Sequence, residues 1–186
     1  ISATEFYQSG RFDDTLRLNG SVFYYDYSDG QGYITVLNII GTPSTRLGTV
    51  GDAEHKGVEL DLTWQATDQL SLQASAGWLD AEITDSDAVS LSWLGELVPL
   101  EGTKRANSPD FSYSLRGRYE IPVGTTTLAL MADYSWRDTL RGDGLSIIED
   151  TLYRQLDAYG LLGARIALQD DDGRWELAKK EKNLTD

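Results

Sequence analysis

The stretch Val58-Glu59-Leu60-Asp61-Leu62-Thr63-Trp64 decides the fold class, because apolar and polar side chains alternate along it without a break. Successive side chains of a β-strand point to opposite faces, so this period of two predicts a strand with one apolar face and one polar face. The same alternation recurs in the segments 16–24, 70–78, 111–121 and 128–136. Helical periodicity is absent over most of the sequence. We therefore predict an all-β protein.

Eight strands follow from this alternation, and the connections between them differ in length. The strands are predicted at residues 1–9, 15–38, 46–66, 69–84, 110–122, 125–140, 157–169 and 173–182. Short connections are predicted at 10–14, 67–68, 122–125 and 170–173, and longer ones at 39–45, 85–109 and 141–156. Short turns at one end and long loops at the other are typical of the antiparallel up-and-down meander of a transmembrane β-barrel.

Strand length and aromatic placement favour a membrane-spanning sheet over a soluble sandwich. Sandwich strands are usually about 5–6 residues long, whereas a tilted strand needs about 9–11 residues to cross a bilayer. Along the apolar face, the short-turn end has Trp64, Tyr119 and Trp175, and the long-loop end has Tyr24, Trp78, Tyr113, Tyr134 and Trp136. Two aromatic bands around an aliphatic belt are expected where a barrel meets the two lipid headgroup layers.

The polar faces of the strands carry charges of both signs, which suits the wall of a wide, wet or plugged lumen. We expect these residues to point inward together: Arg17, Glu59, Asp61, Arg116, Arg118, Glu120 and Asp133. The alternative is a self-contained eight-stranded barrel or sandwich that acts as a structural or binding module. A small closed barrel would have to bury these charges in one paired network.

Composition excludes several other classes of protein. The 186 residues hold 30 acidic and 16 basic side chains, for a formal net charge of −14, which argues against a nucleic-acid partner. There is no cysteine and a single histidine, His55, so disulfide frameworks, thiolate metal sites and histidine-based catalytic triads are not expected. Asp170-Asp171-Asp172-Gly173 lacks the downstream glutamate of a calcium loop and is interpreted as a tight hairpin turn. We predict no enzyme activity, no cofactor and no bound metal.

Five segments, taken in order, resemble one known family. They are Phe23-Tyr24-Tyr25-Asp26-Tyr27-Ser28-Asp29, His55-Lys56-Gly57-Val58-Glu59-Leu60-Asp61, Asn107-Ser108-Pro109 before Phe111-Ser112, Asp172-Gly173-Arg174-Trp175-Glu176, and Asn183-Leu184-Thr185-Asp186. This ordered set is similar to the later part of the barrel in TonB-dependent outer-membrane receptors. Each segment alone is weakly specific, and the order and spacing carry the resemblance.

The resemblance implies both a fold and a function. Residues 1–186 would be a partial β-barrel domain, about eight strands in the wall of a 22-stranded plugged barrel in the bacterial outer membrane. Such receptors actively take up scarce ligands, most often ferric siderophores and sometimes cobalamin or oligosaccharides. The implied partners are outer-membrane lipid, the ligand, and the TonB complex, which acts on an N-terminal motif of the receptor. We expect that motif, the plug and the final strands to lie outside this chain, because both of its ends read as internal sequence.

Ligand contacts are expected in the long loops. Aromatic and guanidinium groups there would suit planar, anionic siderophores through stacking and paired hydrogen bonds. The candidates are Trp93, Arg105, Trp136, Arg137, Arg141, Tyr153 and Arg154.

The run Lys179-Lys180-Glu181-Lys182 departs from the family pattern, which usually has aliphatic or aromatic residues here. By the phase of Trp175 and Leu177, Lys179 should lie on the lipid-facing side. A lysine at mid-bilayer on a barrel costs about 2–4 kcal/mol, and less near the interface.

Overall fold

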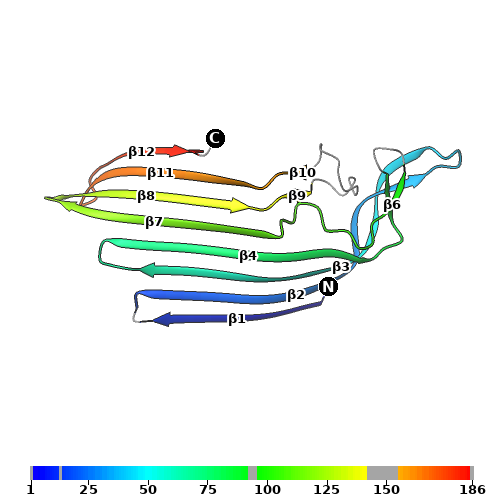
Figure 1. Cartoon of the computed structure of the whole chain (residues 1–186), viewed down its shortest axis with the longest axis horizontal. Coiled ribbons are helices and arrows are strands. Elements are labelled where there is room, and N and C mark those ends of the chain that lie inside the picture. Colours follow the sequence, from blue (N-terminus) through cyan, green and yellow to red (C-terminus); the bar gives the residue numbers. More distant parts are fainter. Residues whose placement is uncertain (1, 13, 92–95, 142–154, 185–186) are drawn as a thin grey trace.

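One eight-stranded antiparallel sheet dominates the computed structural model, which describes residues 2–12, 14–91, 96–141 and 155–184. Its strands are β1 (Ser2–Phe12), β2 (Leu16–Leu37), β3 (Pro43–Gln65), β4 (Leu70–Asp85), β7 (Phe111–Val123), β8 (Thr126–Arg137), β11 (Tyr159–Asp170) and β12 (Glu176–Lys182). Each strand of the sheet pairs with the next one along the chain, as Figure 1 shows. The predicted eight-stranded meander is confirmed, with every predicted strand overlapping an observed one.

The long connections hold structure that the alternation pattern did not predict. Within 85–109 lie β5 (Val89–Leu91) and β6 (Leu97–Pro99), which pair with each other. Next to β8, β9 (Leu140–Arg141) pairs with β10 (Gln155–Leu156). The prediction of a loop at 39–45 was wrong in part. The strand β3 already begins at Pro43, so only a tight turn remains between β2 and β3. Proline is tolerated there because it is the first residue of a strand.

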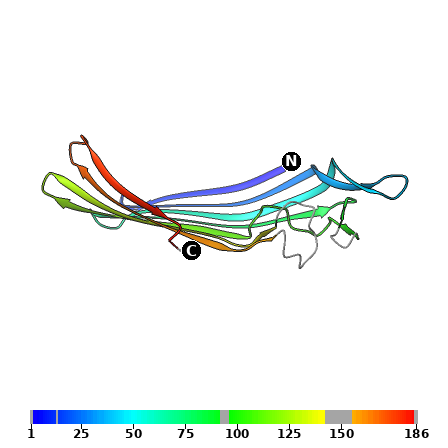
Figure 2. The ribbon, with the colours of Figure 1, turned by 90° about the horizontal axis from the view of Figure 1, so that it is seen from above.

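The sheet is a single layer, open at both edges, as Figure 2 shows. The accessible surface of the whole chain is 12535 Å², whereas a globular protein of 20.6 kDa is expected to expose about 8,900 Å². The strand order places β1 at one edge and β12 at the other, so the described strands close no small barrel. The two other sheets, β5–β6 and β9–β10, have strands of only two or three residues and cannot form the second layer of a sandwich. The alternative of a self-contained barrel or sandwich was therefore wrong.

Strand register sorts the side chains onto two faces. Val22, Val58, Trp78 and Phe111 are paired across β2, β3, β4 and β7, so their side chains share the apolar face. Val22, Trp78 and Phe111 remain exposed, at 53%, 45% and 39% of their full accessibility, and Val58 is half-buried. An apolar face with no protein layer on it is what a lipid-facing wall requires. Among the described residues, none forms a helix with the length and apolar composition that crossing a bilayer demands.

The small hydrophobic core lies at the long-loop end. Val50, Ile83 and Leu100 are buried there, and Ile34 and Ala88 pack against them. Ile83 belongs to the polar face of β4, so Leu100 brings the 96–104 segment over that face. Backbone hydrogen bonds from Ile83 N to Thr103 O (2.9 Å) and from Arg105 N to Ala81 O (2.9 Å) fix the segment beside β4.

Candidate functional site

The polar face forms a continuous hydrophilic wall across the middle of the sheet. A single cross-strand row joins Asp61, Ser75, Ser114 and Ser135 on β3, β4, β7 and β8. The hydroxyls of Ser75 and Ser114 lie 2.7 Å apart, and Arg116 is paired with Asp133 in the neighbouring row. A shallow hollow of about 470 Å³ opens above these side chains. Such a surface suits contact with water or with a polar partner.

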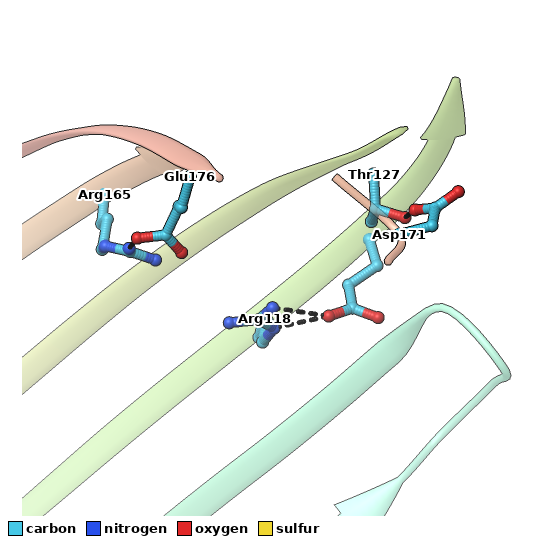
Figure 3. A network of polar contacts seen from close by, with 6 residues as sticks. Arg118, Thr127, Arg165, Asp171 and Glu176 are labelled. Carbon is cyan, nitrogen blue, oxygen red and sulfur yellow. Dashed lines mark hydrogen bonds and ion pairs between the residues drawn. The ribbon is translucent and has the colours of Figure 1, made fainter. Parts of the chain in front are cut away.

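Toward the short turns, charges of opposite sign pair along this wall (Figure 3). Arg118 Nη2 lies 2.6 Å from Glu120 Oε1, and Arg165 Nη2 lies 2.5 Å from Glu176 Oε1. The pairing therefore places these charges on the polar face, as predicted for Arg118 and Glu120. Strand register also places the other residues that were predicted to point inward on the polar face, namely Arg17, Glu59, Asp61, Arg116 and Asp133. Because all these groups are partly exposed, the pairs chiefly balance charge and add little stability.

A row of aromatic rings lies along the polar face toward the long-loop end. Phe23, Tyr25 and Tyr27 alternate along β2, with ring centroids 5.2 Å and 6.2 Å apart. Tyr27 then meets the imidazole of His55 on β3 at 4.7 Å. This aromatic row was not predicted, because the sequence around it is aromatic on both faces. The signal that could have found it is aromatic residues at positions i, i+2 and i+4 on the phase that carries Arg17 and Asn19.

His55 lies outside the outer aromatic band, because Tyr24 of that band is paired with Lys56 and Trp78 with Val58, both nearer the short-turn end. Burial lowers the pKa of the His55 imidazole, and the nearby positive charge of Arg105 lowers that pKa further. Nε2 of His55 is buried and has no hydrogen-bond partner among the described residues. A neutral imidazole beside a guanidinium is thus available on this face.

Arg137, on β8, makes a cation–π contact. Its guanidinium lies over the ring of Tyr159 on β11, 4.3 Å from the ring centroid. Register pairs Arg137 with Ser112 and Tyr159, so both members of the contact lie on the polar face. A guanidinium over an aromatic face can still donate hydrogen bonds from its edge, and Nη1 of Arg137 donates one to the backbone oxygen of Asp138 at 3.4 Å.

The other predicted ligand residues are distributed differently. Trp136 lies on the apolar face, stacked on Tyr113 with ring centroids 5.6 Å apart. This position belongs to the outer aromatic band rather than to the polar wall. Arg141 lies in β9, where it is paired with Gln155 of β10. Trp93, Tyr153 and Arg154 lie outside the described residues.

Two further sequence predictions can be placed. Asp170–Gly173 forms the hairpin turn between β11 and β12, where Arg174 donates to both carboxylate oxygens of Asp170, from Nε at 2.7 Å and from Nη2 at 3.0 Å. Lys179 lies on the apolar face, paired with Ile166, as its phase predicted. Its ammonium contacts Glu181 at 3.0 Å, so the outward lysine has a partner of opposite charge.

Comparison with known proteins agrees with this arrangement. Residues 4–184 match the family model described as TonB dependent receptor-like, beta-barrel. The fold is similar to the siderophore receptor PiuA from Acinetobacter baumannii (20% identity, TM-score 0.69, covering 99% of this chain and 24% of that one). It is also similar to the ferric yersiniabactin uptake receptor FyuA from Yersinia pestis (17% identity, TM-score 0.75, 99% and 24%) and to the copper transporter OprC (18% identity, TM-score 0.64, 98% and 25%). The chain thus spans about a quarter of the length of these receptors.

With its apolar face exposed and its polar face forming a wall, the chain belongs to the TonB-dependent receptor family, as part of a β-barrel of the bacterial outer membrane.

Proposed function

We propose that the receptor containing this chain actively takes up a ferric siderophore or a similar small metal chelate. Residues 1–186 would be one partial barrel domain, and the TonB complex would supply energy through the N-terminal region of the complete receptor. The family consists of transporters and not of enzymes. The observation that carries the proposal is the gathering of aromatic rings and cationic groups on the lumen side of the wall, at its outer end.

These groups match the chemistry of a ferric siderophore. Many such chelates are planar and anionic, so rings can stack on them and guanidinium groups can donate paired hydrogen bonds to them. On one part of the wall, Tyr27 and His55 offer two rings in contact, tilted by 47° to each other, beside Arg105. On another part, Arg137 lies over Tyr159. Below both parts, the polar wall would let a hydrophilic ligand pass without crossing an apolar surface.

The proposed contact residues differ in part from those expected from sequence. Arg105 and Arg137 stay in the set, because they lie on the lumen side, and the loop residues Trp93, Arg141, Tyr153 and Arg154 stay as candidates. Tyr27, His55 and Tyr159 are added. Trp136 is instead proposed for the outer lipid interface, since it stacks on Tyr113 on the apolar face.

Uptake by the complete receptor in a bacterial strain without other siderophore receptors tests the proposal. Cells would be given ⁵⁵Fe bound to catecholate, hydroxamate or phenolate siderophores. We expect uptake of at least one of these chelates, and its loss when TonB is deleted. Transport of copper ions without transport of any ferric chelate would overturn the proposal, and one structural neighbour is described as a copper transporter.

Variants of the two arginines locate the site. Arg105→Ala and Arg137→Ala should each weaken chelate binding by about tenfold, the usual effect of losing one charged hydrogen bond. Arg174→Ala is the matched control, because this arginine lies at the short-turn end and pairs with Asp170. Equal affinity in all three variants would remove the outer wall from the binding site.

A further inference from the structure

The outer part of the β2–β3 hairpin extends beyond the rest of the sheet, as Figure 1 shows. We call residues 30–51 the β2–β3 arm. Irregular pairing separates the arm from the wall, with register shifts between Tyr27 and Gly30 and between Asp52 and Ala53. At this junction Asp29 and Gly51 have positive φ angles of 55° and 119°, and the Asp29 backbone N–H donates to Asp52 Oδ1 at 3.0 Å. The arm is thus directed separately from the strands below it.

The base of the arm is firmly packed. Val50 is buried against Ile83 and Leu100, and Ile34 packs on the same cluster. Two glycines make room for this packing, since a Cβ at Gly32 would lie 2.5 Å from Val50 Cγ2, and one at Gly48 would lie 2.5 Å from Ile34 Cδ1. Larger residues would not fit at either position without displacing the core. The arm therefore holds its tip in a defined place.

That tip exposes an apolar surface. Ile39 and Ile40 are 103% and 81% exposed, and Leu37 at the start of the turn is exposed as well, as is Leu47 further down the arm. The turn is well ordered, because Asn38 Oδ1 accepts hydrogen bonds from the backbone N–H groups of Ile40 (3.0 Å) and Thr42 (2.8 Å). Gly41 supplies the positive φ of 78° that the turn needs. A fixed turn that presents two isoleucines to solvent is a mark of an interaction surface.

The low charge of the arm and its strand pairing also indicate an interaction surface. One residue in four of the chain is charged, so a stretch as long as 31–45 would ordinarily hold about four charges, yet it holds none. Within the described part of the chain, residues 43–50 of β3 pair only with β2, so the other edge of this segment is open. Exposed edges are normally protected by charged side chains, by proline inside the strand, or by cover from another segment. Arg46 is the only charged residue of this open edge, and the tip beyond it is apolar and uncharged, so we expect another segment to cover it.

We propose that the tip of the β2–β3 arm docks on an apolar surface formed by outer loops of the same receptor, contributed by the part of it outside residues 1–186. Solved relatives are about four times as long as this chain, so most of the loops at the outer end come from sequence beyond it. The paired part of the arm, from Gln31 to Leu37, extends roughly 20 Å past the junction, far enough to reach neighbouring loops. Because the tip is uncharged, its partner surface is apolar rather than a sugar or phosphate. Docking would tie the loops together around the mouth of the barrel.

Site-specific photo-crosslinking in the complete receptor tests this proposal, in the outer membrane of intact cells. A photoreactive amino acid replaces Leu37, and the crosslinked peptides are identified by mass spectrometry. We expect crosslinks within one receptor molecule, to peptides outside residues 1–186. Crosslinks that double the molecular mass, crosslinks to another protein, or no protein crosslink would each overturn the proposal.

A matched pair of variants controls for the loss of apolar contact. With the probe at Leu37, the Ile39→Ser/Ile40→Ser variant should lose about nine-tenths of the crosslink, whereas Ile39→Val/Ile40→Val should keep most of it. Equal crosslinking in both variants would mean that apolar contact does not hold the tip. The proposal depends on family membership and not on the ligand, so crosslinking can succeed even where chelate uptake fails.

Discussion

Lys179 of β12 is paired directly with Ile166 of β11 on the apolar face, and its ammonium lies 3.0 Å from Glu181 on the same strand. Both charges border a hollow on that face whose lining includes Gly117, Ala132 and Ala164. In an outer-membrane barrel this places an ion pair where lipid is expected. The pair lowers the cost of exposing either charge to lipid, but two apolar residues would have no such cost.

Replacing the ion pair with leucines should therefore stabilise the barrel. We expect Lys179→Leu/Glu181→Leu to raise the free energy of unfolding of the complete receptor by about 1–4 kcal/mol, the range found when paired charges are replaced by apolar residues. The measurement is denaturant unfolding in the presence of lipid vesicles. Lys179→Leu alone should gain less, because it leaves Glu181 unpaired. A double variant less stable than the parent would show that this face contacts something other than hydrocarbon.

Gly57 should tolerate no side chain. A Cβ at this position would lie 2.5 Å from the carbonyl oxygen of Trp78 and 2.5 Å from the Phe23 ring, and the carbonyl is backbone that cannot easily move. Gly57→Ala should therefore cost about 1–3 kcal/mol of stability and displace the start of the aromatic row. Gly77→Ala is the matched control on the next strand, since its Cβ would have only Ser112 Oγ nearby, at 3.9 Å. Thermal unfolding of both variants checks this, and equal stabilities would contradict it.

The turn between β11 and β12 should give stability that acid removes. Hydrogen bonds from the Arg174 side chain lower the pKa of the Asp170 carboxyl below its usual value of 3.8. A group whose pKa is lower in the folded state stabilises that state above the unfolded pKa, and this contribution disappears as the pH falls through the folded pKa. Asp170→Asn should thus be less stable than the parent near neutral pH, and the difference should shrink on acidification below pH 3.8.

Unfolding midpoints measured against pH check the role of Asp170. Asp68→Asn, at the short turn between β3 and β4, serves as the control. A difference between parent and Asp170→Asn that stays constant down to the lowest pH would show that the carboxylate charge is not responsible.

The alternation of apolar and polar residues was sufficient to predict the sheet. Because the side-chain period of a strand is two, the alternation predicted the eight strands, the polar-face position of the charged residues and the outward position of Lys179. The same rule was not applied to the ligand candidates, where Trp136 and Arg137 were grouped although neighbours in a strand point to opposite faces. Their separation onto the apolar and polar faces follows directly from that geometry.

Other features depend on contacts that no local pattern contains. The core of Val50, Ile83 and Leu100 joins three distant segments, and the β2–β3 arm is recognisable only when its register with β2 is known. Phe23, Tyr24 and Tyr25 are aromatic on both faces, so alternation could not assign the aromatic row to the lumen side. These residues carry much of the proposed site, which explains why the fold was predictable and the site only partly so.

Substitutions of Trp136 and Arg137 test the lipid-facing side and the lumen side separately, because the two residues are adjacent in the sequence and point in opposite directions. Trp136→Ala should lower the stability of the barrel in lipid by about 1–3 kcal/mol, through loss of interfacial and stacking contacts with Tyr113, and leave chelate affinity unchanged. Arg137→Ala should do the reverse, weakening chelate binding while unfolding like the parent. The two measurements are denaturant unfolding with lipid vesicles and a binding titration with the transported chelate. If Trp136→Ala weakened binding as much as Arg137→Ala, the assignment of Trp136 to the lipid interface would have to be abandoned.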